Sequence, residues 1–140
     1  MKVKQLAVFI ENKPGRVSEV AELVGRSGAN IRGFSVSDTA DYGIMRLIVD
    51  RPDETRAVLK EAGFTVREDE VICVELPDQP GALGSVLHAV SDAGVNIEYV
   101  YSLVGTAVVL NVSDADRALH LLEGGPVKLM SQEDIAAYTA

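Results

Sequence analysis

The 140-residue chain is 47% hydrophobic and 24% charged, which is typical of a globular protein and excludes a disordered one. Its apolar runs are too short to span a bilayer, and its basic N-terminus lacks the apolar core of a signal peptide, so we expect a cytoplasmic protein without a membrane partner. The net charge is −8, and residues 70–140 carry the excess, with 2 Lys/Arg against 10 Asp/Glu. An acidic chain repels phosphate backbones, so nucleic acid is not expected as a partner.

The first half of the chain predicts the element order βαββαβ. Apolar residues at i, i+3, i+4 and i+7 indicate the first helix, and glycines end both helices. The expected elements are a strand over residues 6–10, a helix from Val17 to Gly28, a strand from Asn30 to Val36, a turn over 38–42, a strand over 44–49, a helix from Arg51 to Gly63 and a short strand over 64–66.

The second half repeats this order at an offset of 66 residues. Its first helix has the same apolar stripe, its own closing glycine and its own Asn-Ile pair. These matching positions are Leu83, Val86, Leu87, Val90, Gly94, Asn96 and Ile97. A shorter hairpin turn at Val104-Gly105 reduces the offset of the later elements below 66 residues, because loops commonly absorb deletions. The remaining expected elements are a strand over 71–74, a strand that begins at Asn96, a strand over 107–112, a helix over 115–122 and a strand over 127–130. A tail follows over 131–140, with one helical turn that Ser131 caps.

A Pro-Gly turn follows the first strand of each half. In the sequence Asn12-Lys13-Pro14-Gly15, Pro14 fixes φ, and Gly15 allows a partner to approach the backbone closely. The first amides of the next helix point outward with the positive end of the helix dipole, which predicts a small anion site. The same turn recurs as Asp78-Gln79-Pro80-Gly81. This repetition makes the motif more specific than a single Pro-Gly turn, which is ordinary loop punctuation.

The predicted fold class is α+β: two tandem ferredoxin-like units over residues 1–69 and 70–140, each an antiparallel four-stranded sheet with both helices on one face. Several strands are apolar almost throughout, including the strand over 6–10. A sheet face that met only water would alternate polar and apolar residues. We therefore expect the bare face to meet another sheet, and hence a homodimer.

The sequence contains no evident catalytic or metal-binding cluster. Cys73 is the single cysteine and lies in an apolar strand, so we expect a buried thiol. His88 and His120 lie in different predicted helices, away from Cys73, so no metal is expected. No nucleophile stands beside a base and no cofactor loop is present, so neither an enzyme nor a cofactor is expected. Tyr99 and Tyr101 share one strand face and are expected to be packing or interface residues rather than a nucleic-acid platform.

Taken together, these motifs resemble the ACT domain family. The resemblance rests on Asx-x-Pro-Gly after the first strand, the aliphatic stripe of the next helix and Gly-x-Asn-Ile at the second strand, and both halves carry it. It implies a ferredoxin-like fold and a non-catalytic regulatory module, similar to stand-alone proteins of two ACT domains. Such modules bind a small effector, usually an amino acid, where two domains meet, and signal to a metabolic enzyme. The alternatives are a ligand-free adaptor that docks on a partner enzyme, and a small enzyme on the same fold.

The resemblance also implies which residues bind the effector. They are the two turns with the helix starts that follow, and the two strand starts: Asn12, Lys13, Pro14, Gly15, Arg16, Val17, Asn30, Ile31, Asp78, Gln79, Pro80, Gly81, Ala82, Leu83, Asn96 and Ile97. The second turn is similar to the Gly-Ala-Leu element of phenylalanine-binding ACT domains, but their Glu-Ser-Arg-Pro motif is absent.

Simpler roles remain open for these residues. Asn12 and Asp78 are as suited to capping a helix or forming a turn as to contacting a ligand, and Asn30 and Asn96 follow a helix-ending glycine and are suited to satisfying turn amides. If the two second strands pair antiparallel, each turn lies beside the strand start of the other half. Because the first turn has Lys13 and Arg16, we expect it to be the tighter anion site.

Overall fold

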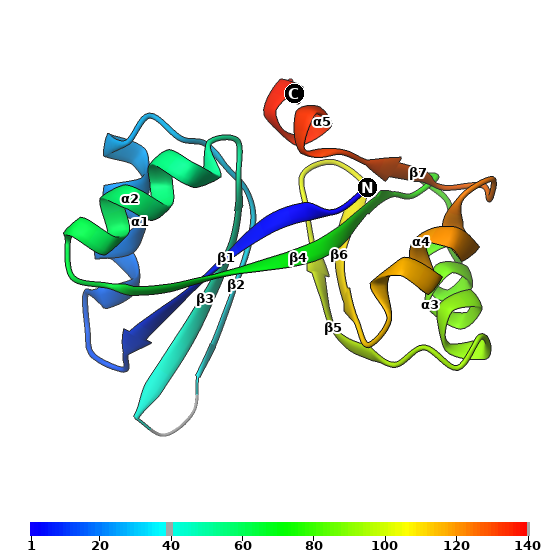
Figure 1. Ribbon diagram of the computed structural model, residues 1–140, viewed down its shortest axis with the longest axis horizontal. Helices are drawn as coiled ribbons and strands as arrows, with labels where there is room; N and C mark the ends of the chain where they lie inside the picture. Colours follow the sequence, from blue (N-terminus) through cyan, green and yellow to red (C-terminus); the bar gives the residue numbers. More distant parts are fainter. Residues whose placement is uncertain (39–40, 140) are drawn as a thin grey trace.

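The structure is a computed structural model that describes residues 1–38 and 41–139. Its elements are β1 Val3–Glu11, α1 Arg16–Arg26, β2 Ile31–Asp38, β3 Tyr42–Val49, α2 Pro52–Glu61, β4 Thr65–Glu75, α3 Ala82–Asp92, β5 Ile97–Ser102, β6 Ala107–Val112, α4 Ala115–Leu122, β7 Lys128–Met130 and α5 Gln132–Ala137 (Figure 1). The turn expected over 38–42 includes residues 39 and 40, which lie outside the described residues. None of the helices in the described ranges is long and apolar enough to cross a membrane.

The strand order confirms two ferredoxin-like units. The first repeat, residues 1–69, forms a sheet in the order β2-β3-β1-β4, and the second repeat, residues 70–140, forms one in the order β7-β4-β6-β5. All paired strands are antiparallel. In both sheets the fourth strand of the repeat is an edge strand next to the first, as the plait requires.

One strand, β4, belongs to both sheets. The sequence predicts a short strand over 64–66 and a separate one over 71–74, and this prediction is wrong. The charged segment between them continues the strand, because β1 pairs with it from Thr65 to Val71. β6 then pairs with the other edge of β4 from Ile72 to Glu75. Backbone pairing therefore outweighs the polar composition of this segment, and the domain boundary predicted after residue 69 lies inside β4.

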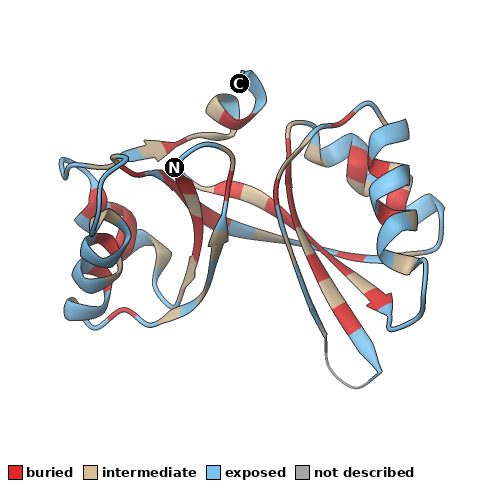
Figure 2. Ribbon diagram, turned by 180° about the vertical axis from the view of Figure 1, so that it is seen from behind, coloured by how far each residue is buried: buried red, intermediate tan, exposed pale blue. Residues whose placement is uncertain are grey.

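Each helix pair covers one face of its own sheet. In the first repeat, Val20 and Val24 of α1 and Leu59 of α2 are fully buried against Leu6 and Val8 of β1. An equivalent cluster in the second repeat joins α3 and α4 to β4, β5 and β6. Figure 1 shows the two helix pairs at opposite ends of the molecule with the sheets between them, and Figure 2 shows buried residues where helices meet strands.

The bare faces of the two sheets meet each other within the chain. A third apolar cluster joins Val3 and Ile48 of the first repeat to Leu103 and Val109 of the second, with Cys73 fully buried among them. This confirms the buried thiol and the expectation that the bare face meets another sheet. Because that sheet lies in the same chain, the apolar strands no longer require a dimer, and the dimer stays a prediction.

The backbones of the two sheets also meet where β2 passes the end of β5. Gly33 forms an antiparallel bridge with Leu103, and the amide of Val104 donates to the Arg32 carbonyl at 2.9 Å. A Cβ atom at Gly33 would lie 2.7 Å from Leu103 Cδ1, which can shift, and 3.1 Å from the Ser102 carbonyl oxygen, which belongs to the backbone, so this close approach favours glycine. From this contact the β2-β3 and β5-β6 hairpins diverge, and the molecule has the shape of a V (Figure 1).

Candidate functional site

The two Pro-Gly turns have the same backbone. Gly15 and Gly81 are the N-cap residues of α1 and α3, with φ of 87° and 86°, and neither helix has a side-chain cap. In both turns the amide after the glycine donates to a carbonyl three residues earlier, at 3.3 Å. Asn12 and Asp78 therefore do not cap the helices, so the capping alternative is wrong, and the turn-forming alternative stays a prediction. A left-handed residue suits glycine because a Cβ atom would be strained there.

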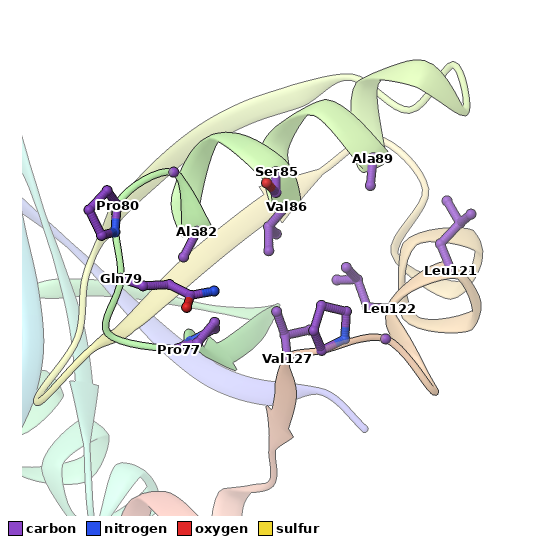
Figure 3. A pocket seen from close by; sticks show the side chains of 13 residues that line it. Pro77, Gln79, Pro80, Ala82, Ser85, Val86, Ala89, Leu121, Leu122 and Val127 are labelled. Carbon is purple, nitrogen blue, oxygen red and sulfur yellow. The ribbon is translucent and has the colours of Figure 1, made fainter.

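The second turn opens on an apolar cavity, which we call the second-turn cavity, with a volume of about 320 Å³. It lies between the turn, α3 and the link from α4 to β7, and it is lined by Pro77, Gln79, Pro80, Gly81, Ala82, Ser85, Val86, Ala89, Leu121, Leu122, Gly125, Pro126 and Val127. Figure 3 shows the Gln79 side chain reaching from the turn into the cavity towards Val127. None of these residues carries a titratable side chain.

The first turn opens on a cavity at the equivalent place, about 370 Å³ in volume, which we call the first-turn cavity. It is lined by Phe9, Glu11, Arg16, Glu19, Tyr42, Ala62, Gly63, Phe64 and Thr65. Three of these side chains are charged and they pair with one another. The Arg16 guanidinium lies 2.9 Å from the Glu19 carboxylate and 3.6 Å from that of Glu11.

The cations of the first turn are already neutralised. Lys13 Nζ lies 2.8 Å from Glu11 Oε2, and this hydrogen bond, followed by the charges of Lys13 and Arg16, lowers the pKa of the Glu11 carboxyl. The expectation that Lys13 and Arg16 make the first turn the tighter anion site assumed free cations. Because Glu11 and Glu19 already pair with both, an incoming anion would meet less positive charge than two free cations provide.

The residues at the two strand starts form hydrogen bonds within their own repeats. The Asn30 amide donates to Asp50 Oδ1 at 2.8 Å and its side chain to Asp50 Oδ2 at 3.4 Å. The Asn96 amide donates to Ser113 Oγ at 3.0 Å. In these bonds the asparagines donate to Asp50 and Ser113, so the simpler role, in which the asparagine side chains satisfy turn amides, stays a prediction.

A third cavity, the junction groove, lies between the repeats. It has a volume of about 690 Å³, and Val17, Ile31 and Met45 of the first repeat line it together with the segment 102–104 of the second. Both turn cavities are lined by residues of their own repeat alone. The segment 102–104 lies beside Ile31, and the second turn does not line this groove. The predicted pairing of each turn with the strand start of the other repeat stays a prediction.

A family model described as an ACT domain pair matches residues 1–137. The chain belongs to this family. Comparison with curated proteins finds no match. Among solved structures, a protein from Bacteroides thetaiotaomicron is 36% identical, with a TM-score of 0.91 over 99% of this chain and 98% of that one.

Two further structures have the fold of this ACT pair. The ligand-free regulatory subunit of aspartate kinase from Thermus thermophilus has a TM-score of 0.62 at 18% identity, covering 85% of this chain and 89% of that one. The regulatory subunit of aspartate kinase from Thermus flavus has a TM-score of 0.59 at 15% identity, with the same coverage. At such identities the likeness shows the fold alone.

A polar link between the two sheets of the ACT pair was not predicted. Gln5 is fully buried, and its amide donates to Tyr99 Oη at 2.8 Å while its carbonyl accepts from Tyr101 Oη at 2.6 Å. Asn111 Nδ2 also donates to Tyr99 Oη, at 2.8 Å, and the Arg46 guanidinium lies 4.0 Å from the centre of the Tyr99 ring. Burial raises the pKa of Tyr101, which therefore stays neutral. This link confirms the packing or interface role expected for both tyrosines. The one signal of its partner was Gln5, which directly precedes the apolar residues 6–10.

Proposed function

We propose that this ACT pair is a non-catalytic regulatory protein that binds a small amino acid in the second-turn cavity. The observation that carries the proposal is an apolar cavity that opens beside the start of α3. A carboxylate suits the outward amides and positive dipole end of that helix start. An apolar side chain suits the valine, leucine and proline walls, and the Gln79 carbonyl is placed to accept a hydrogen bond from an ammonium group.

The size and chemistry of the cavity support this class of ligand. Ligand pockets typically measure about 300–1,000 Å³, so a cavity of about 320 Å³ suits one small molecule rather than a nucleotide or a cofactor. Its lining contains no acid, base or thiol. Catalysis by proton transfer or nucleophilic attack needs such a group, so the lining favours binding over reaction.

We propose that the signal passes through a homodimer to a metabolic enzyme. Both repeats expose an apolar patch at the same place, where the first helix passes the second strand: Val17 and Phe34 are 41% and 59% exposed in the first repeat, and Leu83 and Val100 are 41% and 38% exposed in the second. Apolar side chains beside an edge strand are typical of an interaction surface. The same patches favour the alternative function, a ligand-free adaptor that docks on a partner enzyme.

Isothermal titration calorimetry against the twenty amino acids tests the proposal. We expect saturable binding of an apolar amino acid by the wild type. Ala82→Arg should weaken this binding about tenfold or more, because the longer side chain fills the cavity mouth. Gly84→Arg adds the same charge to the same helical turn outside the cavity, where a Cβ atom meets nothing within 4 Å, and should leave binding unchanged.

Two outcomes would contradict the proposal. If no amino acid binds the wild type, the adaptor function is favoured. If Ala82→Arg binds as well as the wild type while the fold is intact by circular dichroism, the effector binds elsewhere.

A further inference from the structure

The C-terminal helix α5 belongs to the second repeat but packs on both repeats. Ser131 and Asp134 form a capping box at its start, which confirms the predicted helical turn. Gln132 Oε1 accepts a hydrogen bond from the Lys4 amide of β1 at 3.0 Å. Ile135 is fully buried in the apolar cluster that joins the bare faces of the two sheets. The helix therefore lies across the junction of the repeats at the closed end of the V (Figure 1).

Arg32 of β2 holds the far end of α5. Its Nε donates to the Ile135 carbonyl at 3.3 Å and its Nη2 to the Tyr138 carbonyl at 3.2 Å. The guanidinium also lies 5.6 Å from the centre of the Tyr138 ring and 3.9 Å from the Asp50 carboxylate. A cation at the end of a helix satisfies carbonyls that have no partner within the helix. The Arg32 side chain is only 16% exposed, so these bonds are largely shielded from water.

Few contacts keep α5 in place. The helix has 6 residues, too few to be stable by itself in water. Ile135 is its one buried residue. A cavity of about 260 Å³ lies between the tail and the hairpin at Gly105, lined in part by Ala137 and Tyr138. Incomplete packing and a short helix place α5 among the segments that open at low free-energy cost.

We propose that α5 is a latch that keeps the two sheets closed on each other, and that Arg32 is the residue that holds the latch shut. When α5 detaches, the shared cluster loses Ile135, and the Val104 amide and Arg32 carbonyl are free to separate. The repeats then open about β4, the strand they share. The Asp50 carboxylate that faces Arg32 also accepts a hydrogen bond from the Asn30 amide. Asp50 therefore links the Arg32 side chain to the residue that precedes β2.

Cys73 reports whether the latch is open. It is the single cysteine of the chain and lies fully buried in the cluster between the sheets. A thiol reagent reaches it when the sheets separate, and the labelling rate follows the open population when reclosing is faster than labelling. Amide hydrogen exchange at Val104 and Lys4 reports the same opening through two of the bonds that cross the junction.

The test compares Arg32→Ala with the wild type in the absence of any effector. We expect about tenfold or faster labelling of Cys73 and faster exchange at Val104 and Lys4, because two charge-assisted hydrogen bonds to α5 are lost. Arg51→Ala is the matched control. It also removes one arginine, which pairs with Glu54 at 3.7 Å away from α5, and it should label like the wild type.

A second control separates the latch from general destabilisation. Leu122→Ala weakens the core of the second repeat and leaves α5 intact. At equal loss of unfolding free energy, Arg32→Ala must label Cys73 faster than Leu122→Ala. Equal labelling rates, or faster exchange confined to residues 132–139, would overturn the proposal. The test needs no ligand, so it stands or falls independently of the proposed effector.

Discussion

The two Pro-Gly turns of the ACT pair have the same backbone and different chemistry. Each places a left-handed glycine before a helix and opens on a cavity of similar size. Arg16 and Glu19 make the first cavity polar, whereas Ala82 and Ser85 stand at the matching positions of the second. The fold therefore determines where a cavity forms, and a few side chains at the helix start determine what it can hold.

Exchanging those side chains should have the largest effect. Arg16→Ala with Glu19→Ser removes the Arg16–Glu19 ion pair from the first-turn cavity, leaves Glu11 paired with Lys13, and keeps walls that include Phe9, Tyr42 and Phe64. We expect the variant to gain a second binding site for the amino acid that we propose binds in the second-turn cavity. Titration calorimetry should show the stoichiometry rise from one to two ligands per chain. An unchanged stoichiometry would mean that the two cavities differ in more than charge.

Replacing the turn glycines should have equal effects in the two repeats. Gly15→Ala and Gly81→Ala each place a Cβ atom at a φ near +87° or +86°, where the strain is about 1–2 kcal/mol, although a Cβ atom meets nothing within 4 Å. Urea denaturation should give the same loss of unfolding free energy for both. Gly25→Ala, inside α1, should instead stabilise the protein slightly. Unequal losses at the two turns would show that the backbone likeness does not extend to energetics.

The smallest expected effect concerns the pKa of the Glu11 carboxyl, which lies beside the first turn. Hydrogen bonding from Lys13, together with the charges of Lys13 and Arg16, lowers this pKa below its ordinary value of 4.5. Because the folded pKa is the lower one, the ion pairs stabilise the fold above pH 4.5, and this contribution is lost as the pH falls through the folded pKa.

Carboxyl NMR titration measures the Glu11 pKa directly. Lys13→Gln should raise it towards the ordinary value, since the largest cause of the shift is removed. Lys2→Gln, which breaks an ion pair with Asp116 elsewhere, should leave the Glu11 pKa unchanged. A Glu11 pKa that does not respond to Lys13→Gln would mean that the cations of the first turn are free in solution.

The sequence determined the parts of the structure that depend on neighbouring residues. The glycines that end the helices, the left-handed Gly15 and Gly81 and the Ser131 cap act within about one turn of backbone, so each is visible in a short segment. The 66-residue repeat then shows that the unit occurs twice. Together these signals predict two βαββαβ units and place both turns at helix starts.

The tertiary structure decided which distant groups meet. Residues 67–70 are charged and resemble a loop, and they become strand because β1, 60 to 66 residues away, pairs with them. The pairing of Gln5 with Tyr99 and Tyr101, and of Arg32 with the carbonyls of α5, joins segments about 100 residues apart. Whether Lys13 and Arg16 are free or paired likewise depends on the final positions of Glu11 and Glu19. Local backbone preferences cannot encode such contacts, because their free energy appears only when the two sheets share β4 and close on each other.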